Sequence, residues 1–504
     1  MTNIIELYNF KKMLRKIRLS LAIVFFSLVT LLFLDFTGTL HGWLSWMATI
    51  QFLPALLALH LVVVAAWVAV TLVFGRIYCS VICPLGVMQD VVSWLSGRRN
   101  KRRKRLRFSY SPAKQWLRYV MLAVFIAAWV AGIAAVPALL APYSSYGRIA
   151  QNLLQPIYLL GNNALACLSE HLASYAFYGR EVWIRSMPTF LIAALTFVIL
   201  VVLAWRNGRT YCNTICPVGT VLSFFARFSW MKVRIDERKC VGCGLCAKGC
   251  KAACIDFKNH KIDYSRCVVC GDCLDNCHKD ALHFGRGESE ELKASDSGRR
   301  SFLLATATVA ATAALAQEKK KVDGGLAAVT QKEPFKRSTP ITPPGSLSAQ
   351  NMARHCTACQ LCVAECPNDV LRPSTDLMRL MQPTMSYERG YCRPECHRCS
   401  EVCPAGAIKP IKREDKSSIQ IGHAVWSKKN CIVFTDGVEC GNCARHCPAG
   451  AIMMVPTDPK DESAPKFPAV DLTRCIGCGA CENLCPAKPF SAIHVEGHEV
   501  HKYI

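Results

Sequence analysis

The sequence is short of acidic residues and contains no Cys-x2-Cys-His motif. Aspartate and glutamate total 36 against 60 lysines and arginines, which gives a formal net charge of +24. Such an excess suits nucleic acid or a membrane surface as a partner, and where the basic residues lie decides between them. The missing Cys-x2-Cys-His excludes the usual covalent attachment of a c-type haem. Charged residues are also nearly missing from four long apolar runs within residues 1–205.

These four apolar runs predict membrane-spanning helices, because each is long enough to cross about 30 Å of hydrocarbon. They cover residues 19–36, 52–74, 119–141 and 187–205. Eight basic residues lie in 98–107 and five more precede the first run, whereas 37–51 has no Lys or Arg. The positive-inside rule then places the N-terminus and residues 98–107 in the cytoplasm, together with the chain directly after residue 205. We therefore interpret the basic run 98–107 as a topology signal and expect membrane lipid, not nucleic acid, as a partner.

Most of the 30 cysteines fall in quartets with the spacing of iron–sulfur ligands, which distinguishes the chain from a disulfide-rich protein. Two quartets follow the apolar runs: Cys240, Cys243, Cys246 and Cys250, then Cys267, Cys270, Cys273 and Cys277. Four more lie near the C-terminal end: motif one (Cys356, Cys359, Cys362, Cys366), motif two (Cys392, Cys396, Cys399, Cys403), motif three (Cys431, Cys440, Cys443, Cys447) and motif four (Cys475, Cys478, Cys481, Cys485). Six [4Fe–4S] clusters are thus expected, and motifs one to four leave no cysteine of their region for a disulfide.

In two-cluster ferredoxins, three closely spaced cysteines hold one cluster and the fourth reaches across to the other. We therefore expect one cluster on Cys240, Cys243, Cys246 and Cys277, and a second on Cys267, Cys270, Cys273 and Cys250. Cys254 is a spare thiol nearby, and the usual proline after the fourth cysteine is replaced by Lys251 and His278. A zinc ribbon, which needs only four ligands, is the alternative.

A twelve-residue motif occurs twice, each time directly after two of the apolar runs. Residues 75–86 read GRIYCSVICPLG and residues 208–219 read GRTYCNTICPVG, with eight identities at an offset of 133. If the two halves pack around a pseudo-twofold axis, their cysteines meet and could hold a seventh cluster. These four cysteines are Cys79, Cys83, Cys212 and Cys216. The alternatives are that Cys-x3-Cys-Pro shapes a helix end, or that it acts as a redox thiol pair.

The predicted fold is multi-domain: a four-helix α transmembrane anchor plus α+β ferredoxin-like [4Fe–4S] domains. The expected divisions are a membrane domain with both repeats, a two-cluster ferredoxin domain, a linker and a four-cluster ferredoxin-type domain, over residues 1–235, 236–285, 286–350 and 351–504. Within the linker, Arg299-Arg300 and the alanine-rich run to Ala316 are similar to a Tat export signal. Residues 299–316 are thus a signal or anchor helix, and a surface-lying or buried linker helix is the alternative.

The order of these parts resembles two proteins joined end to end. Residues 1–285 resemble the membrane component (NapH) of the quinol dehydrogenase that serves periplasmic nitrate reductase, on the four helices, both Cys-x3-Cys-Pro motifs and the following ferredoxin. Residues 297–504 resemble its exported four-cluster partner (NapG), on Arg299-Arg300 and the long gap from Cys431 to Cys440. The methylamine-utilisation ferredoxins (MauN and MauM) are similar to both.

This resemblance implies menaquinol oxidation at the bacterial inner membrane and electron delivery to a periplasmic reductase or cytochrome c. It places the first ferredoxin domain in the cytoplasm and the four-cluster domain in the periplasm. It also implies that motif one pairs with four and motif two with three, so that Cys485 joins motif one and Cys366 joins motif four. The alternative function is an electron-donating assembly or maturation factor for a periplasmic or membrane metalloenzyme, because the repeat also resembles proteins of copper-enzyme biogenesis.

A quinol site needs a proton acceptor in or near the membrane. His60 is the titratable side chain well inside an apolar run, and such residues are functional candidates. A histidine that packs between helices is the alternative. Weaker candidates are Glu170, His171, Glu181 and Asp90.

Overall fold

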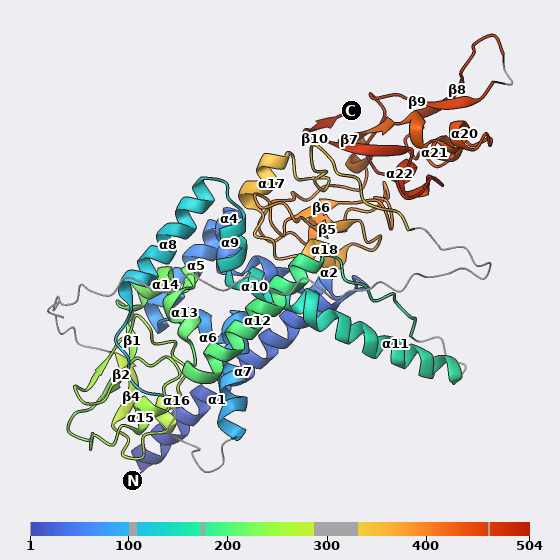
Figure 1. Cartoon of the computed structure of the whole chain (residues 1–504). Helices are drawn as coiled ribbons and strands as arrows, with labels where there is room; N and C mark the ends of the chain where they lie inside the picture. The colour runs from blue at the N-terminus through green and yellow to red at the C-terminus, as the bar shows by residue number, and fades with distance from the viewer. Residues whose placement is uncertain (1, 100–107, 173–176, 287–330, 462–463) are drawn as a thin grey trace, which may run out of the picture.

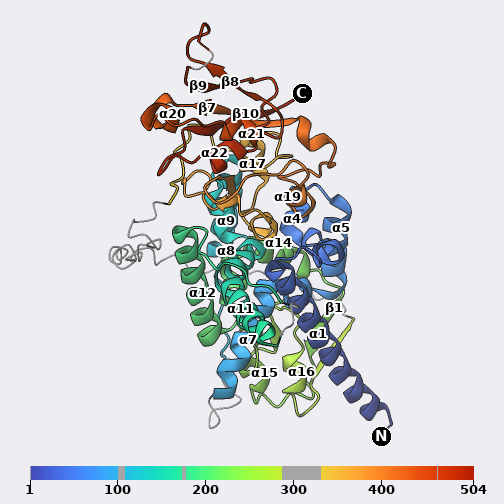
Figure 2. The ribbon, with the colours of Figure 1, turned by 90° about the vertical axis from the view of Figure 1, so that its right-hand side faces the viewer.

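The computed structural model describes residues 2–99, 108–172, 177–286, 331–461 and 464–504. A helical domain comes first, followed by a small ferredoxin-like unit (residues 231–286) and a C-terminal unit (residues 331–504). Figure 1 shows these two units at opposite ends of the helical domain, with the N-terminus beside the first unit. Figure 2 shows the same separation from the side. The predicted Tat-like segment 299–316 lies outside the described residues.

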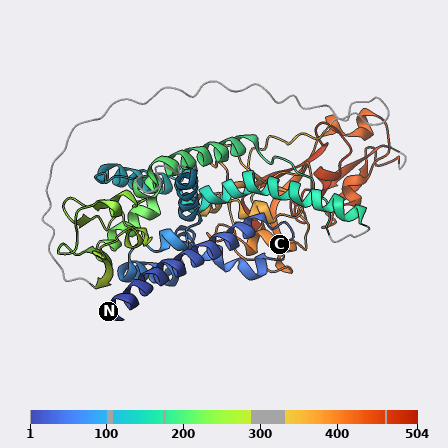
Figure 3. The same ribbon diagram turned by 90° about the horizontal axis from the view of Figure 1, so that it is seen from below.

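The helical domain is built mainly of helices that run between the two ends, as Figure 3 shows for α1 and α12. Its elements are α1 Thr2–Leu34, α2 His41–Leu44, α3 Trp46–Thr49, α4 Phe52–Leu57, α5 Leu61–Phe74, α6 Tyr78–Val81, α7 Pro84–Arg99, α8 Gln115–Val130, α9 Ala135–Leu140, α10 Pro142–Ile149, the π-helix η1 Ala150–Leu154, α11 Gln155–His171, α12 Met187–Asn207, α13 Thr210–Thr214 and α14 Pro217–Ala226.

Two helices of the described chain, rather than the four predicted, are long and apolar enough to cross a membrane: Met13–Leu34 within α1 and Met187–Asn207. The second predicted span is broken between α4 and α5, where Leu59 has a φ of 57°. The third is broken between α8 and α9, where Gly132 has a φ of 74°. A left-handed residue ends the ladder of helical hydrogen bonds. Apolar composition alone does not reveal such breaks, because it is the same on both sides of them.

Each ferredoxin-like unit consists of short helices and two-stranded antiparallel sheets. The first unit contains β1 Met231–Ile235, α15 Leu245–Lys248, β2 Ile255–Asp256, β3 Lys261–Ile262, α16 Asp272–Asp275 and β4 Leu282–Arg286, with β1 paired to β4 and β2 to β3. The C-terminal unit contains α17 Ala349–His355, α18 Leu361–Glu365, β5 Leu371–Pro373, β6 Pro383–Met385, α19 Arg398–Glu401, η2 Asp415–Ser418, β7 Ile419–Trp426, η3 Lys428–Asn430, α20 Ile432–Thr435, α21 Asn442–Arg445, β8 Ile452–Pro456, β9 Lys466–Val470, α22 Ala480–Leu484 and β10 Ile493–Tyr503. Its sheets pair β5 with β6, β7 with β10 and β8 with β9.

One buried apolar core runs through the helical domain into both units. It includes Cys270 of the first unit, the four repeat cysteines, and Cys359 and Cys362 of motif one. A separate core surrounds motifs three and four. Motifs one and two therefore pack against the helical domain, and motifs three and four form the far part of the C-terminal unit.

A buried group of charges joins the loop after α1 to the C-terminal unit. His41 Nδ1 lies 2.8 Å from Glu365 Oε2 and 3.6 Å from Asp35 Oδ2. All three residues are buried, and Arg398 Nη1 lies 3.4 Å from the other oxygen of Glu365. Burial alone would lower the pKa of His41, but the two carboxylates outweigh burial and raise that pKa to about 9. The two carboxylates therefore hold a protonated histidine at this junction.

Replacing His41 with leucine should weaken the docking of the C-terminal unit by about 3–5 kcal/mol, because the buried carboxylates of Asp35 and Glu365 lose the histidine cation between them. In the wild type, a pKa raised from 6.5 stabilises docking fully below about pH 6.5, and this stabilisation is lost as the pH rises through about 9. Limited proteolysis of the full chain in detergent across this pH range would show the loss of docking as faster cleavage. The exposed His171 provides the control His171→Leu. A cleavage rate that is the same in wild type and His41→Leu at pH 6 would contradict this prediction.

Candidate iron–sulfur centres and the path between them

The first ferredoxin-like unit brings together the two sets of cysteines that their spacing predicts. Cys250, Cys267, Cys270 and Cys273 line one cavity. In the other set, burial and then the neighbouring thiols of Cys277, Cys240 and Cys243 raise the pKa of Cys246 to about 11. Four thiols crowded in this way ionise together only when positive charge nearby balances the thiolates. The iron of a bound cluster would supply that positive charge.

Cys254 lines the same cavity as Cys250, and the two sulfur atoms lie 3.5 Å apart. Both thiols are buried. The structure therefore offers five thiols around this centre, and either Cys250 or Cys254 can serve as the fourth ligand beside Cys267, Cys270 and Cys273.

In the C-terminal unit, the motifs pair differently from what the family resemblance implies: one pairs with two, and three with four. Burial and then Cys356, Cys359 and Cys403 raise the pKa of Cys362, whereas burial and then Cys392 and Cys366 raise that of Cys399. One cavity is lined by Cys447, Cys475, Cys478 and Cys481, and another by Cys431, Cys440, Cys443 and Cys485. Cys485 thus does not join motif one, and Cys366 does not join motif four. Spacing could not settle this, because every motif offers the same kind of fourth cysteine.

Backbone amides point at the sulfur of the fourth cysteine in several of these centres. Ala281, Ala451 and Ala492 donate to the Sγ atoms of Cys277, Cys447 and Cys485, each at 3.3 Å. Amide hydrogen bonds to ligand sulfurs stabilise thiolates and tune the potential of a bound cluster. The donors, the cavities and these amides all fit [4Fe–4S] clusters.

The cysteines of the two repeats meet in the middle of the helical domain, as the pseudo-twofold hypothesis expects. Cys79, Cys83, Cys212 and Cys216 are each 4–5% exposed. Burial and then the thiols of Cys212 and Cys83 raise the pKa of Cys216. The Nε2 atom of Gln89 donates to Cys212 Sγ at 3.3 Å, and the amide of Gly219 donates to Cys216 Sγ at 3.3 Å. The four thiols form one buried group. In the sequence, the repeat is the signal that predicts this group.

The arginine of each repeat reaches across the axis to the other repeat. Arg76 Nη2 donates to the carbonyl oxygen of Cys212 at 3.2 Å, and Arg209 Nη1 donates to that of Cys79 at 2.6 Å. The last glycine of each repeat makes room for this exchange. A Cβ atom at Gly86 or Gly219 would lie 2.3 or 2.4 Å from the carbonyl oxygen of Cys79 or Cys212. The arginines and last glycines, which are identical in the two repeats, thus form reciprocal contacts around the thiols, called the arginine lock below.

Helices α9 and α10 connect this thiol group to motif one. Tyr211, beside Cys212, donates its hydroxyl to the carbonyl oxygen of Leu140 at 3.0 Å. Arg148 is fully buried and interacts electrostatically with both Tyr211 and Cys359. Gly147 approaches motif one so closely that a Cβ atom there would lie 2.4 Å from the carbonyl oxygen of Cys359. Buried side chains therefore bridge the repeat cysteines and the nearest C-terminal centre.

The role of His60 as an intramembrane acid–base group stays a prediction, which the structure does not test. His60 is exposed and lies in the break before α5 rather than inside a continuous span. Glu170 and His171 are exposed at the end of α11, and Asp90 is paired with Arg209 at 2.8 Å and Lys251 at 3.1 Å. Glu181 lines a cavity between the helical domain and the C-terminal unit.

Models of known protein families match four stretches of the chain. A 4Fe–4S binding domain matches residues 55–103 and 189–236, which contain the two repeats. Two 4Fe–4S dicluster domains match residues 438–488 and 263–370. The first of these dicluster matches extends from motif three to motif four, in agreement with the pairing seen in the structure.

Three proteins from other organisms are similar to parts of this chain. The uncharacterized protein MJ0749 of Methanocaldococcus jannaschii is 44% identical over 61 residues, 12% of this chain and 25% of that protein. The methylamine utilization ferredoxin-type protein MauM of Methylobacillus flagellatus is 30% identical over 31% of this chain and 69% of its own length. The ferredoxin-type protein NapF of Escherichia coli is 27% identical over 35% of this chain and 99% of its own. The match thus spans a quarter of the first relative and more than two thirds of the other two.

Proposed function

The chain belongs to the family of ferredoxin-type 4Fe–4S proteins that includes MauM, and from this premise we propose that it oxidises menaquinol in a membrane and passes the electrons to a periplasmic acceptor. One observation carries the proposal. A single buried core contains Cys270 of the first ferredoxin-like unit, the repeat cysteines, and Cys359 and Cys362 of motif one. In this proposal the electrons pass along the core to the centres of motifs one and two and from there to those of motifs three and four.

A membrane location is supported by apolar side chains that face outward along three helices. Each of the following side chains is at least 45% exposed: Leu19, Leu21, Ile23 and Val24 on α1, Val120, Val124 and Ile126 on α8, and Leu191, Leu195, Val198, Ile199 and Val202 on α12. An apolar surface of this extent needs lipid or protein to cover it. The N-terminal end of α1 and the first ferredoxin-like unit would then face the cytoplasm, and the C-terminal unit the periplasm.

In this function the clusters would carry the redox chemistry, and the chain would fix their spacing and exclude water. The six quartets would hold six [4Fe–4S] clusters. Cys79, Cys83, Cys212 and Cys216 would hold a seventh, which is favoured by their burial in one group and by the arginine lock around them.

Anaerobic mixing of the oxidised full chain with a menaquinol analogue tests the proposal, with cluster reduction followed by EPR and visible absorption. We expect rapid reduction of the clusters. Reduction by a low-potential donor alone would contradict quinol oxidation. A reporter fused after Ile504 tests the orientation, and we expect activity only from a reporter that works in the periplasm.

A second candidate function is electron supply to the maturation of a metalloenzyme. It is favoured by the presence of Cys270 of the first unit in the same core as the repeat cysteines, since this gives a cytoplasmic donor a route to motif one. Reduction by a cytoplasmic ferredoxin but not by menaquinol would be the outcome that supports it.

A further inference from the structure

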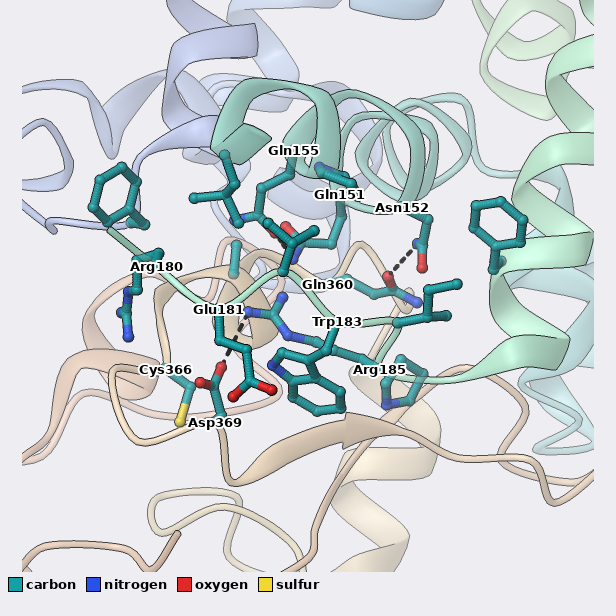
Figure 4. Close-up of a pocket in the computed structure, with 18 residues that line it drawn as sticks. Gln151, Asn152, Gln155, Arg180, Glu181, Trp183, Arg185, Gln360, Cys366 and Asp369 are labelled. Atoms are coloured by element: carbon teal, nitrogen blue, oxygen red, sulfur yellow. Dashed lines mark hydrogen bonds and ion pairs between the residues drawn. The ribbon is translucent and has the colours of Figure 1, made fainter. Parts of the chain in front are cut away.

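A pocket lies between the helical domain and the C-terminal unit, with Cys366 among its lining residues (Figure 4). Its other walls come from η1 with the start of α11, and from the segment 180–185 that precedes α12. The pocket encloses about 50 Å³ of free space and is partly open to solvent. Sites for small organic molecules commonly lie at such junctions.

Three polar atoms of residues that line this pocket are buried and have no hydrogen-bond partner among the described residues. They are Gln151 Oε1, Gln360 Nε2 and Arg185 Nη1. The Gln151 and Gln360 side chains belong to residues that are 5% and 1% exposed. A buried polar atom without a partner costs about 1–3 kcal/mol. One acceptor and two donors beside a cavity therefore indicate a ligand with both a hydroxyl group and an oxygen acceptor.

Neighbouring contacts hold these atoms in place. Asn152 Nδ2 donates to Gln360 Oε1 at 3.0 Å, which leaves the Gln360 amide nitrogen free. Arg185 Nη2 donates to Asp369 Oδ1 at 3.4 Å, which leaves Nη1 free. Gln151 and Asn152 lie on the π-helix η1, a rare element that is frequent at functional sites. Figure 4 shows Gln151 on the helix side and Gln360 and Arg185 across from it.

The remaining wall is apolar and lies at the ends of the two helices long enough to span a membrane. Phe36 follows α1, and Phe190 lies in the first turn of α12. Pro156 and Leu159 of α11 complete this side. A ring bound among the polar atoms could extend an apolar tail past these side chains into lipid.

We propose that this pocket binds the ring of a quinol, an inference that rests on the proposed function and gives it a site. One ring hydroxyl donates to Gln151 Oε1, and the other ring oxygen accepts from Gln360 Nε2 and Arg185 Nη1. Oxidation of the quinol to the quinone releases two electrons and two protons. Oxidised [4Fe–4S] clusters would accept these electrons one at a time, and Cys366, which lines the pocket, would help to hold one of them. The protons leave to solvent at the mouth, beside the exposed carboxylate of Glu181.

Binding of 2-heptyl-4-hydroxyquinoline N-oxide, a fluorescent quinol analogue, tests the site without any turnover. Titration of the detergent-solubilised full chain should quench the fluorescence of the analogue. Gln151→Leu should weaken binding at least about tenfold, because the buried acceptor is lost. Ile184→Trp, at a half-exposed lining position, should also weaken it by filling the pocket. The exposed Gln350 gives the control Gln350→Leu, which should bind like the wild type.

Unchanged binding in both Gln151→Leu and Ile184→Trp would contradict quinol binding in this pocket, even if menaquinol reduces the clusters. Binding lost in His60→Leu but kept in Gln151→Leu would also overturn it. Binding of the analogue that both pocket variants weaken, without any reduction of the clusters by menaquinol, would support the proposed binding site and contradict the proposed oxidation. The two proposals can therefore fail separately.

Discussion

Changing Cys79 and Cys212 together to serine should lower the iron content of the purified chain by about four atoms, the content of one [4Fe–4S] cluster. The two thiols belong to different repeats and lie in one buried group with Cys83 and Cys216. Two serines cannot replace thiolates as ligands, so the remaining pair would not hold a cluster. Iron and acid-labile sulfide per chain, measured on anaerobically purified protein, give the result directly.

The exposed Cys167 gives a matched control, because Cys167→Ser changes a thiol far from any quartet in sequence. Its iron content should equal that of the wild type. Full iron content in the Cys79→Ser, Cys212→Ser variant would exclude a seventh cluster. The repeat would then be a helix-shaping motif or a redox thiol pair.

Replacing Arg209 with leucine should destabilise the helical domain by about 3–5 kcal/mol, the usual effect of breaking a buried ion pair. Arg209 is 0% exposed, and its Nε and Nη2 atoms each lie 2.8 Å from the carboxylate of Asp90. The same guanidinium donates to the carbonyl oxygen of Cys79. The variant therefore loses both an ion pair and one side of the lock around the repeat thiols. The midpoint of thermal unfolding in detergent should fall clearly.

The neighbouring Arg206 is exposed and supplies the control, since Arg206→Leu should change stability by less than about 0.5 kcal/mol. A double-mutant cycle with Asp90→Leu isolates the pair. Strong coupling is expected, because the second change removes the carboxylate that the first deprives of its two hydrogen bonds from Arg209. Additive effects of the two substitutions would contradict the ion-pair account.

Spacing in the sequence was enough to predict which cysteines gather in the first ferredoxin-like unit and that the cysteines of the two repeats could meet. The first ferredoxin-like unit gathers the expected sets, and the offset of 133 residues indicated that the repeat cysteines could meet. The partners of motifs one and two depend on how long segments pack, so spacing could not fix them. The resemblance to other four-cluster proteins gave the wrong pairing there.

Lys251 departs from the usual ferredoxin motif, and its role became clear only from the structure. It stands where ferredoxins usually have proline, and its Nζ atom contacts Asp90 at 3.1 Å and Asp272 at 2.9 Å. Its carbonyl oxygen accepts from the amide of Arg209 at 2.8 Å. The residue that breaks the ferredoxin pattern therefore docks the first unit onto the helical domain, and Gly208 allows this approach because a Cβ atom would lie 2.3 Å from that oxygen.

The pocket beside Cys366 was beyond sequence reasoning, because its walls come from segments about 200 residues apart. Searching the apolar runs for a titratable residue led to His60, which is exposed in the break before α5. A run of glutamine and asparagine within an otherwise apolar stretch, QNLLQ at 151–155, was the signal that could have indicated a buried polar site.

We expect electrons from menaquinol to leave through the C-terminal unit on the periplasmic side of a membrane. Right-side-out vesicles that contain the full chain, supplied with menaquinol and with ferricyanide outside, test it most directly. The account predicts that the external ferricyanide is reduced at a rate that depends on the chain and falls in Cys366→Ser. Reduction of an acceptor enclosed inside the vesicles, with none outside, would contradict it.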